Sequence, residues 1–242
     1  MGKTVSITDI GRKRKLNQDY VFISDLPVGK LPNLYLVADG MGGHKAGGYA
    51  SKFAVETIVE RISRSLEEDV FTLLYEAIAE ANREVRRKAY EDEAMSDMGT
   101  TLVAATIDDN VLKVANVGDS RLYLIGEDIR QITTDHSLVE EMVRMGGIDR
   151  EQARNHPDKN IITRAIGAEA EIKPDFFEVR LEKNERIFMC TDGVSNMLTD
   201  EEILQILQEP KEGAEQIRRI VEAANEQGGR DNMGVILITP DI

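Results

Sequence analysis

The chain has 242 residues, 41% hydrophobic and 31% charged, which is typical of a globular protein and excludes a disordered, collagen-like or disulfide-stapled chain. Acidic residues exceed basic residues by 14, and this charge disfavours binding to nucleic acid or to anionic membrane surfaces. A single cysteine, no apolar run of about 18 residues and no leader-like start favour a cytoplasmic protein without a membrane span. Without a linker or an internal repeat, residues 1–242 are expected to form one domain.

Apolar patterning predicts strands and then helices in the first third of the chain. Short strands are expected at residues 5–10, 20–25 and 33–39. The third is an almost continuous apolar run that ends on Asp39, as expected of a strand buried on both faces. Apolar residues then recur with helical spacing over residues 50–66 and 73–85, which predicts two adjacent amphipathic helices.

The rest of the chain alternates between strand-rich and helical segments. Strands at 100–107, 111–117, 122–125 and 129–133 are expected to form an antiparallel meander, and 176–181 is expected to pair with 186–190. Helices are expected at 137–145 and 149–156, after a capping box at Thr199, and around 217–224, before a last strand at 233–239. Antiparallel strands with paired helices favour an α+β fold whose sheets are covered by helical layers.

Four aspartates stand at the ends of predicted core strands. Asp39, Asp119 and Asp192 follow apolar runs, and Asp231 precedes the last strand. Any one of them is explained by the preference of Asp for turns. Four carboxylates gathered at one place would repel one another unless cations compensate them. Two divalent ions would balance the charge, and an all-oxygen ligand set favours Mg²⁺ or Mn²⁺.

Six short motifs occur in a fixed order along the chain. They are RKLNQD at 14–19, DGMGGH at 39–44, GTT at 99–101, GDSR at 118–121, TDG at 191–193 and GRDN at 229–232. Over residues 4–240 this series resembles that of the metal-dependent Ser/Thr protein phosphatases of type 2C, in particular their bacterial branch. The resemblance implies a four-layer α-β-β-α sandwich, in which two central antiparallel sheets are each covered by helices and metal ions lie in a cleft at one end.

The resemblance also implies a set of metal ligands. Asp39 resembles the carboxylate that bridges two core ions, with the Gly40 carbonyl on one of them. Asp192 and Asp231 would complete the other core site. Asp119 together with Asp192 is similar to a third, weaker metal site of bacterial members.

Three further positions follow from the same resemblance. Arg14 resembles the arginine that holds the substrate phosphate, and a guanidinium suits bidentate phosphate recognition. Asp19 resembles the acid that orients metal-bound waters, and Gln18 stands where many relatives carry Glu. Residues 144–159, with glycine hinges and few apolar residues, resemble a mobile flap beside the active site.

The activity implied is hydrolysis of phosphoserine and phosphothreonine in proteins by a water that two metal ions activate. Phosphoproteins are the expected substrates, a Ser/Thr kinase is the expected counterpart, and the protein is expected to be a monomer. A cysteine-dependent phosphatase is disfavoured because position 196, six residues after Cys190, is Asn rather than Arg. Cys190 is interpreted as a small buried hydrophobic residue.

Two other functions stay open at this point: a pseudophosphatase that serves as a binding module, and a two-metal phosphohydrolase acting on small phosphate esters or nucleotides. Retention of the four aspartates argues against the first. His44, in the glycine-rich turn after Asp39, has either a role facing the cleft or a structural hydrogen bond. The basic run at 12–15 is either a solvated turn or a patch that attracts phosphopeptides.

Overall fold

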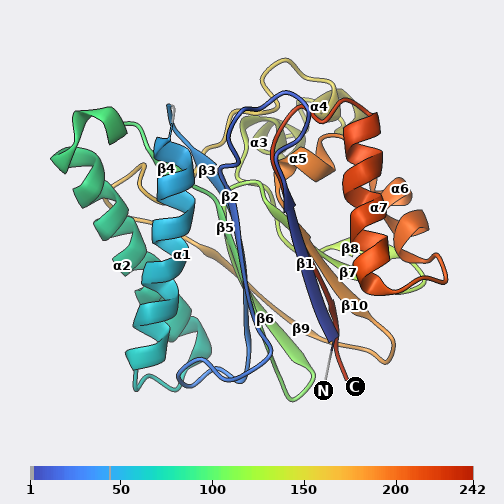
Figure 1. Ribbon diagram of the computed structural model, residues 1–242, viewed down its shortest axis with the longest axis horizontal. Helices are drawn as coiled ribbons and strands as arrows, with labels where there is room; N and C mark the ends of the chain where they lie inside the picture. Colours follow the sequence, from blue (N-terminus) through green and yellow to red (C-terminus); the bar gives the residue numbers. More distant parts are fainter. Residues whose placement is uncertain (1–2, 44, 242) are drawn as a thin grey trace.

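Two antiparallel sheets pack face to face, and helices cover both outer faces (Figure 1). This arrangement is seen in a computed structural model, which describes residues 3–43 and 45–241. One sheet has the strand order β1-β11-β10-β7-β8, and the other has the order β2-β3-β5-β6-β9 with the short β4 paired to β3. The expected four-layer α-β-β-α sandwich is therefore confirmed.

The strands and helices have the following bounds. The first sheet consists of β1 (Lys3–Asp9), β11 (Met233–Thr239), β10 (Arg186–Cys190), β7 (Arg121–Ile125) and β8 (Ile129–Gln131). The second consists of β2 (Asp19–Ser24), β3 (Leu34–Met41), β4 (Gly99–Thr100), β5 (Leu102–Asp108), β6 (Val111–Val117) and β9 (Asp175–Arg180). The α-helices are α1 (Ala46–Arg64), α2 (Val70–Glu91), α3 (Leu138–Arg144), α4 (Arg150–Arg154), α5 (Asp192–Ser195), α6 (Asp200–Leu207) and α7 (Gly213–Glu226), and a 3₁₀ turn spans Glu93–Met95.

Three apolar layers hold the sandwich together. Side chains alternate along each strand, so Leu36 of β3 faces α1 and α2 while its neighbour Val37 packs between the sheets. In the same way Phe188 of β10 faces α6 and α7, and Met189 points into the space between the sheets. Because both faces of these strands are covered, their sequences are continuously apolar, as predicted for β3.

The strand register brings the ends of several strands to one end of the sandwich. Asp19 at the start of β2 pairs with Asp39 near the end of β3. In the other sheet Cys190, the last residue of β10, pairs with Arg121 at the start of β7 and with Val235 near the start of β11. Segments far apart in sequence therefore meet at this end, next to α3 and α4.

Two predicted strand pairings are wrong. Strands β5 and β6 pair in one sheet, whereas β7 and β8 pair in the other, so residues 100–133 do not form a single meander. Similarly, β9 pairs with β6, and β10 pairs with β7 and β11. The chain changes sheet at Gly118, which has φ of 103°, a conformation that favours glycine. Short turns do not reveal such a crossover, because neighbouring strands in sequence usually pair.

Local signals for helices were more accurate. Thr199 forms the predicted capping box with Glu202, and Asp149 forms one with Gln152. Helix α1 begins at Ala46, four residues before the expected start, because the small residues at its beginning show no amphipathic pattern. In the part of the chain that the structure describes, no helix is both long and apolar enough to cross a bilayer.

Packing of α1 on its sheet should dominate local stability. Ile58 is fully buried in this layer, whereas Leu66 just after the helix is 85% exposed. We expect Ile58→Ala to lower the free energy of unfolding by about 2–5 kcal/mol through lost burial and a residual cavity. Leu66→Ala should change it by less than about 0.5 kcal/mol. Urea denaturation of both variants checks this, and equal costs would contradict the assigned packing.

Candidate active site

Asp39 lies two residues before the end of β3, and its backbone is fixed by the GTT motif. The Asp39 N–H donates to Thr101 Oγ1 (2.9 Å), and its carbonyl accepts from Thr101 N–H and from Thr100 Oγ1 (2.9 Å each). The prediction that the strand ends on Asp39 is thus wrong by two residues. Gly40 packs so closely on the chain that an added Cβ would lie 2.0 Å from the Gly47 carbonyl oxygen.

Asp19 faces Asp39 across the β2–β3 pair. Its Oδ2 accepts a hydrogen bond from Thr191 Oγ1 (2.7 Å), and Thr191 Oγ1 itself accepts from Gly234 N–H (2.8 Å). The side chain is therefore oriented by residues of the opposite sheet. Its other oxygen, Oδ1, is buried and has no hydrogen-bond partner among the described residues.

Asp192 is the first residue of the short helix α5, which is separated from β10 by Thr191 alone. Asn196 Nδ2 donates to its Oδ2 (2.8 Å), and its buried Oδ1 has no hydrogen-bond partner in the described part of the chain. The next residue, Gly193, packs against the last loop: an added Cβ would lie 1.8 Å from the Asn232 carbonyl oxygen. The TDG motif thus places the Asp192 carboxylate next to a contact between Gly193 and Asn232 that is too close for a side chain on residue 193.

Asp231 and Arg14 form an ion pair between segments 217 residues apart. Arg14 Nη2 donates to Asp231 Oδ2 (2.6 Å), and Asp231 Oδ1 accepts from Asn232 N–H (2.9 Å). The Asn232 side chain is buried, donates to the carbonyls of Ile10 and Leu16, and accepts from Gln18 N–H. Asn232 therefore joins the last motif to the first.

Asp119 lies at the crossover between the sheets, after Gly118. Its neighbour Ser120 shares a hydrogen bond with Thr101 (2.7 Å), so the GDSR and GTT motifs contact each other. Asp119 is only 8% exposed. It lines both of the hollows described next.

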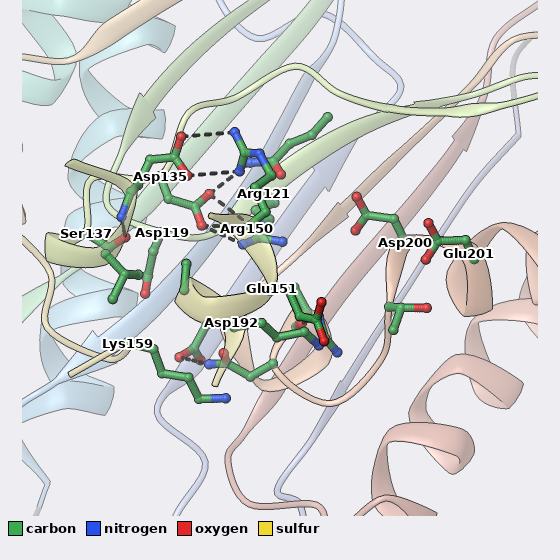
Figure 2. A pocket seen from close by; sticks show the side chains of 18 residues that line it. Asp119, Arg121, Asp135, Ser137, Arg150, Glu151, Lys159, Asp192, Asp200 and Glu201 are labelled. Carbon is green, nitrogen blue, oxygen red and sulfur yellow. Dashed lines mark hydrogen bonds and ion pairs between the residues drawn. The ribbon is translucent and has the colours of Figure 1, made fainter. Parts of the chain in front are cut away.

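A cleft of about 260 Å³ joins these residues at the end of the sandwich. Its lining includes six of the seven predicted site residues, namely Arg14, Asp39, Gly40, Asp119, Asp192 and Asp231. Asp19, the seventh, is not in this lining but pairs with Asp39 across β2 and β3. A second, larger hollow of about 600 Å³ adjoins the cleft below α3 and α4, and shares Asp119 and Asp192 with it (Figure 2).

Burial and mutual repulsion dominate the electrostatics of the cleft. Burial raises the pKa of Asp39 well above its usual range, and the charges of Asp19 and Asp192 raise it further. The pKa of Asp19 rises to about 8 for the same reasons, burial being the largest. Burial also raises the pKa of Asp119 and of Asp192. In the absence of a cation these carboxyl groups are therefore hard to ionise together.

The residues fit a divalent metal. Carboxylates are the charged ligands that the described lining of the cleft offers, and Asp192 carries a buried carboxylate oxygen that a cation would satisfy. In the described ranges, no three His, Cys, Asp or Glu side chains are arranged to hold an ion by themselves. Such an open arrangement suits Mg²⁺, which keeps several waters and takes one or two carboxylates.

Two sets of interactions near the cleft were not predicted from the sequence motifs. Arg121 of GDSR pairs with Asp135 through Nε and Nη2 (3.0 and 2.7 Å), as drawn in Figure 2. His136 accepts from Gly118 N–H (3.1 Å) and contacts Asp175 (3.1 Å), so it supports the crossover, and burial lowers its pKa. The adjacent polar residues Asp135 and His136, which follow β8, were the sequence signal that could have indicated this supporting role.

Two further expectations have different outcomes. Cys190 is fully buried, and burial raises its thiol pKa, which agrees with its interpretation as a hydrophobic residue. His44 lies outside the described residues.

Comparison with known proteins identifies the family. Residues 11–237 match the family model for protein phosphatase 2C. The chain belongs to the protein phosphatase 2C family, in its bacterial branch. The serine/threonine phosphatase stp of Listeria innocua is 40% identical over 236 residues, covering 96% of this chain and 93% of the relative. The predicted family is therefore confirmed, and the chain is a protein serine/threonine phosphatase.

Solved structures give the same answer. The S. agalactiae serine/threonine phosphatase aligns with a TM-score of 0.93 and 32% identity, covering all of both chains. The catalytic domain of the serine threonine protein phosphatase PstP, in complex with 2 manganese ions, aligns with a TM-score of 0.86 and 31% identity over 98% of this chain and 97% of that one.

The raised carboxyl pKa values predict how stability depends on pH when metal is chelated. Folded Asp19 has a pKa of about 8, above its ordinary value of 3.8, so between these values the folded state binds more protons than the unfolded state. Stability from this group is present at low pH and is lost as pH rises toward 8. We expect the free energy of unfolding in EDTA to fall by on the order of 4 kcal/mol between pH 5 and pH 8.

Urea denaturation at both pH values measures this change. The variant Asp19→Asn should flatten the dependence, whereas Asp128→Asn, at an exposed position between β7 and β8, should leave it unchanged. Equal slopes for wild type and Asp19→Asn would contradict the assignment.

Proposed function

We propose that the chain hydrolyses phosphoserine and phosphothreonine in proteins with the help of two Mn²⁺ or Mg²⁺ ions held at the end of the sandwich. When bound, the two ions would activate a water for in-line attack and neutralise the phosphate oxygens. The observation that carries the proposal is the convergence of buried carboxylates with raised pKa values on one open cleft. The manganese ions of the PstP structure support the choice of metal.

Each residue has a proposed role. Asp39, the Gly40 carbonyl, Asp192 and Asp231 would hold the two core ions. Asp119 with Asp192 would form a third, weaker site. All four carboxylates belong to the cleft or its wall, which supports this assignment.

The remaining site residues act on water and on phosphate. Asp19, fixed by Thr191, would orient metal-bound waters. Arg14 would hold the phosphate: its guanidinium is half exposed and lines the cleft while one nitrogen is anchored on Asp231. Anchoring one nitrogen fixes the plane of the group, which favours a defined phosphate position.

The wider setting is proposed from the family. Residues 1–242 would form one catalytic domain that acts as a monomer on phosphoproteins and opposes a Ser/Thr kinase. Residues 144–159, which include α4 and lie over the larger hollow, would be the flap.

Substitution of Asp192 tests the metal-assisted mechanism. We expect Asp192→Asn to lower kcat by more than about 100-fold, by analogy with the loss of one electrostatic stabiliser. Asp128→Asn, which removes the same charge from an exposed position, should keep wild-type turnover. Initial rates on a phosphothreonine peptide, a nucleotide and an aryl phosphate, with Mn²⁺ and with chelator, make the measurement. Wild-type turnover of Asp192→Asn would remove this residue from the mechanism, and preference for the nucleotide would favour a small-molecule phosphohydrolase.

The exposed basic run tests substrate attraction. Arg12 and Lys13 lie beside Arg14, and their backbone N–H groups both donate to the Gly229 carbonyl. We expect the double variant Arg12→Gln/Lys13→Gln to raise KM about 2- to 5-fold for a phosphopeptide and to flatten its salt dependence, because long-range attraction is screened by salt. Unchanged KM at low salt would show that the run is only a solvated turn.

A further inference from the structure

Three cationic side chains gather beside the catalytic cleft. Arg154 ends α4, Lys159 follows it in the next loop, and Arg230 precedes β11. Together they line a hollow of about 340 Å³ next to α6 and α7. We call these three residues the cationic corner.

Acidic residues lie near the cationic corner, among them Glu201 close to Arg154, but none of the three cations forms an ion pair within the described part of the chain. Glu202 is the acidic residue in the lining of this hollow, and both of its oxygens already accept hydrogen bonds, from Gln227 Nε2 (2.8 Å) and from Thr199 N–H (2.7 Å). The side chains of Lys159 and Arg230 form no hydrogen bond or ion pair with any residue that the structure describes. Arg154 donates one hydrogen bond, to the Ser195 carbonyl (3.2 Å).

The three charges are close enough to affect one another. Burial lowers the pKa of Lys159, and the positive charges of Arg154 and Arg230 lower it further, whereas the negative charge of Asp192 acts in the opposite direction. Elsewhere on the same short helix, Arg150 is neutralised by Glu140 (3.0 Å). The positive charges of Arg154, Lys159 and Arg230 repel one another, and a bound anion would relieve that repulsion.

The cationic corner opens toward the place where substrate phosphate would lie. A hollow of about 60 Å³ is lined by Lys159 and Arg230 together with Asp192 and Asp231. Asp192 and Asp231 also line the catalytic cleft, and Figure 2 shows Lys159 beside Asp192. A peptide whose phosphoresidue occupies the cleft therefore carries its neighbouring residues past these cations.

We propose that Arg154, Lys159 and Arg230 form a subsite for a second anionic group on the substrate, a carboxylate or a phosphate in the residues that flank the phosphorylated one. This rests on the proposed phosphoprotein phosphatase function. The guanidinium groups can bind a carboxylate or phosphate through paired N–H donors, and Lys159 adds a point charge. The enzyme would accordingly prefer acidic or multiply phosphorylated sites.

Peptide kinetics test the subsite. The substrates are a phosphothreonine peptide with neutral flanks and versions with Glu, or a second phosphothreonine, one to four residues to either side. We expect kcat/KM to be higher for the best anionic peptide than for the neutral peptide. The ratio of these two kcat/KM values should fall about tenfold in the double variant Arg154→Gln/Arg230→Gln, because two partly exposed charge-assisted contacts are lost. Comparing the Glu peptides with the doubly phosphorylated peptides shows whether the subsite prefers a carboxylate or a phosphate.

The matched control is Arg218→Gln, an exposed arginine of α7 outside both hollows, which should leave the ratio unchanged. A ratio that is the same in wild type and double variant, or that falls equally in the control, would overturn the subsite. Failure of every phosphopeptide as substrate would instead overturn the proposed function.

A binding measurement tests the subsite independently of the proposed phosphatase function. Hydrolysis-resistant phosphonate versions of the peptides are titrated while the Nε–H resonances of Arg154 and Arg230 are followed by NMR. We expect these resonances to shift with the anionic peptide and to stay in place with the neutral one. Equal shifts with both, or none, would overturn the subsite whatever the turnover.

Discussion

Repulsion among the carboxylates at one end of the sandwich is the constraint on which the site depends. Asp39 comes from a strand of one sheet, whereas Asp192 follows a strand of the other, so the repulsion acts across the contact between the two sheets. Burial strengthens it, because water cannot screen these groups. The surrounding structure opposes it with fixed hydrogen bonds from Thr191, Asn196 and Arg14. A compact end of the sandwich is thus maintained around groups that would otherwise separate.

Close backbone contacts hold the carboxylate-bearing segments together against this repulsion. Gly193 packs on the Asn232 carbonyl, and the Asn232 side chain bonds the segment before β2. Three motifs from both ends of the chain are held in one rigid unit in this way. Their separation in sequence explains why the ordered series of motifs is so specific, since each motif shapes the surface on which another rests.

Much of this could be predicted from the sequence, but not all of it. Apolar runs and capping boxes are local signals, so the strands and the helix at Thr199 were predicted close to their true positions. The exchange of strands between sheets at Gly118 depends on which face each strand buries, which no local pattern records. The Arg14–Asp231 ion pair and the cationic corner likewise arise only when distant segments meet.

The burial of the one thiol has a consequence for oxidative conditions. Cys190 sits at the end of β10, fully enclosed, and its raised pKa keeps it in the protonated form, which reacts slowly with peroxide. Phosphatases that use a cysteine nucleophile lose turnover when that sulfur is oxidised. Cys190 does not line the cleft, and the proposed mechanism uses no sulfur, so dephosphorylation by this enzyme should continue under oxidant levels that silence thiol-dependent enzymes.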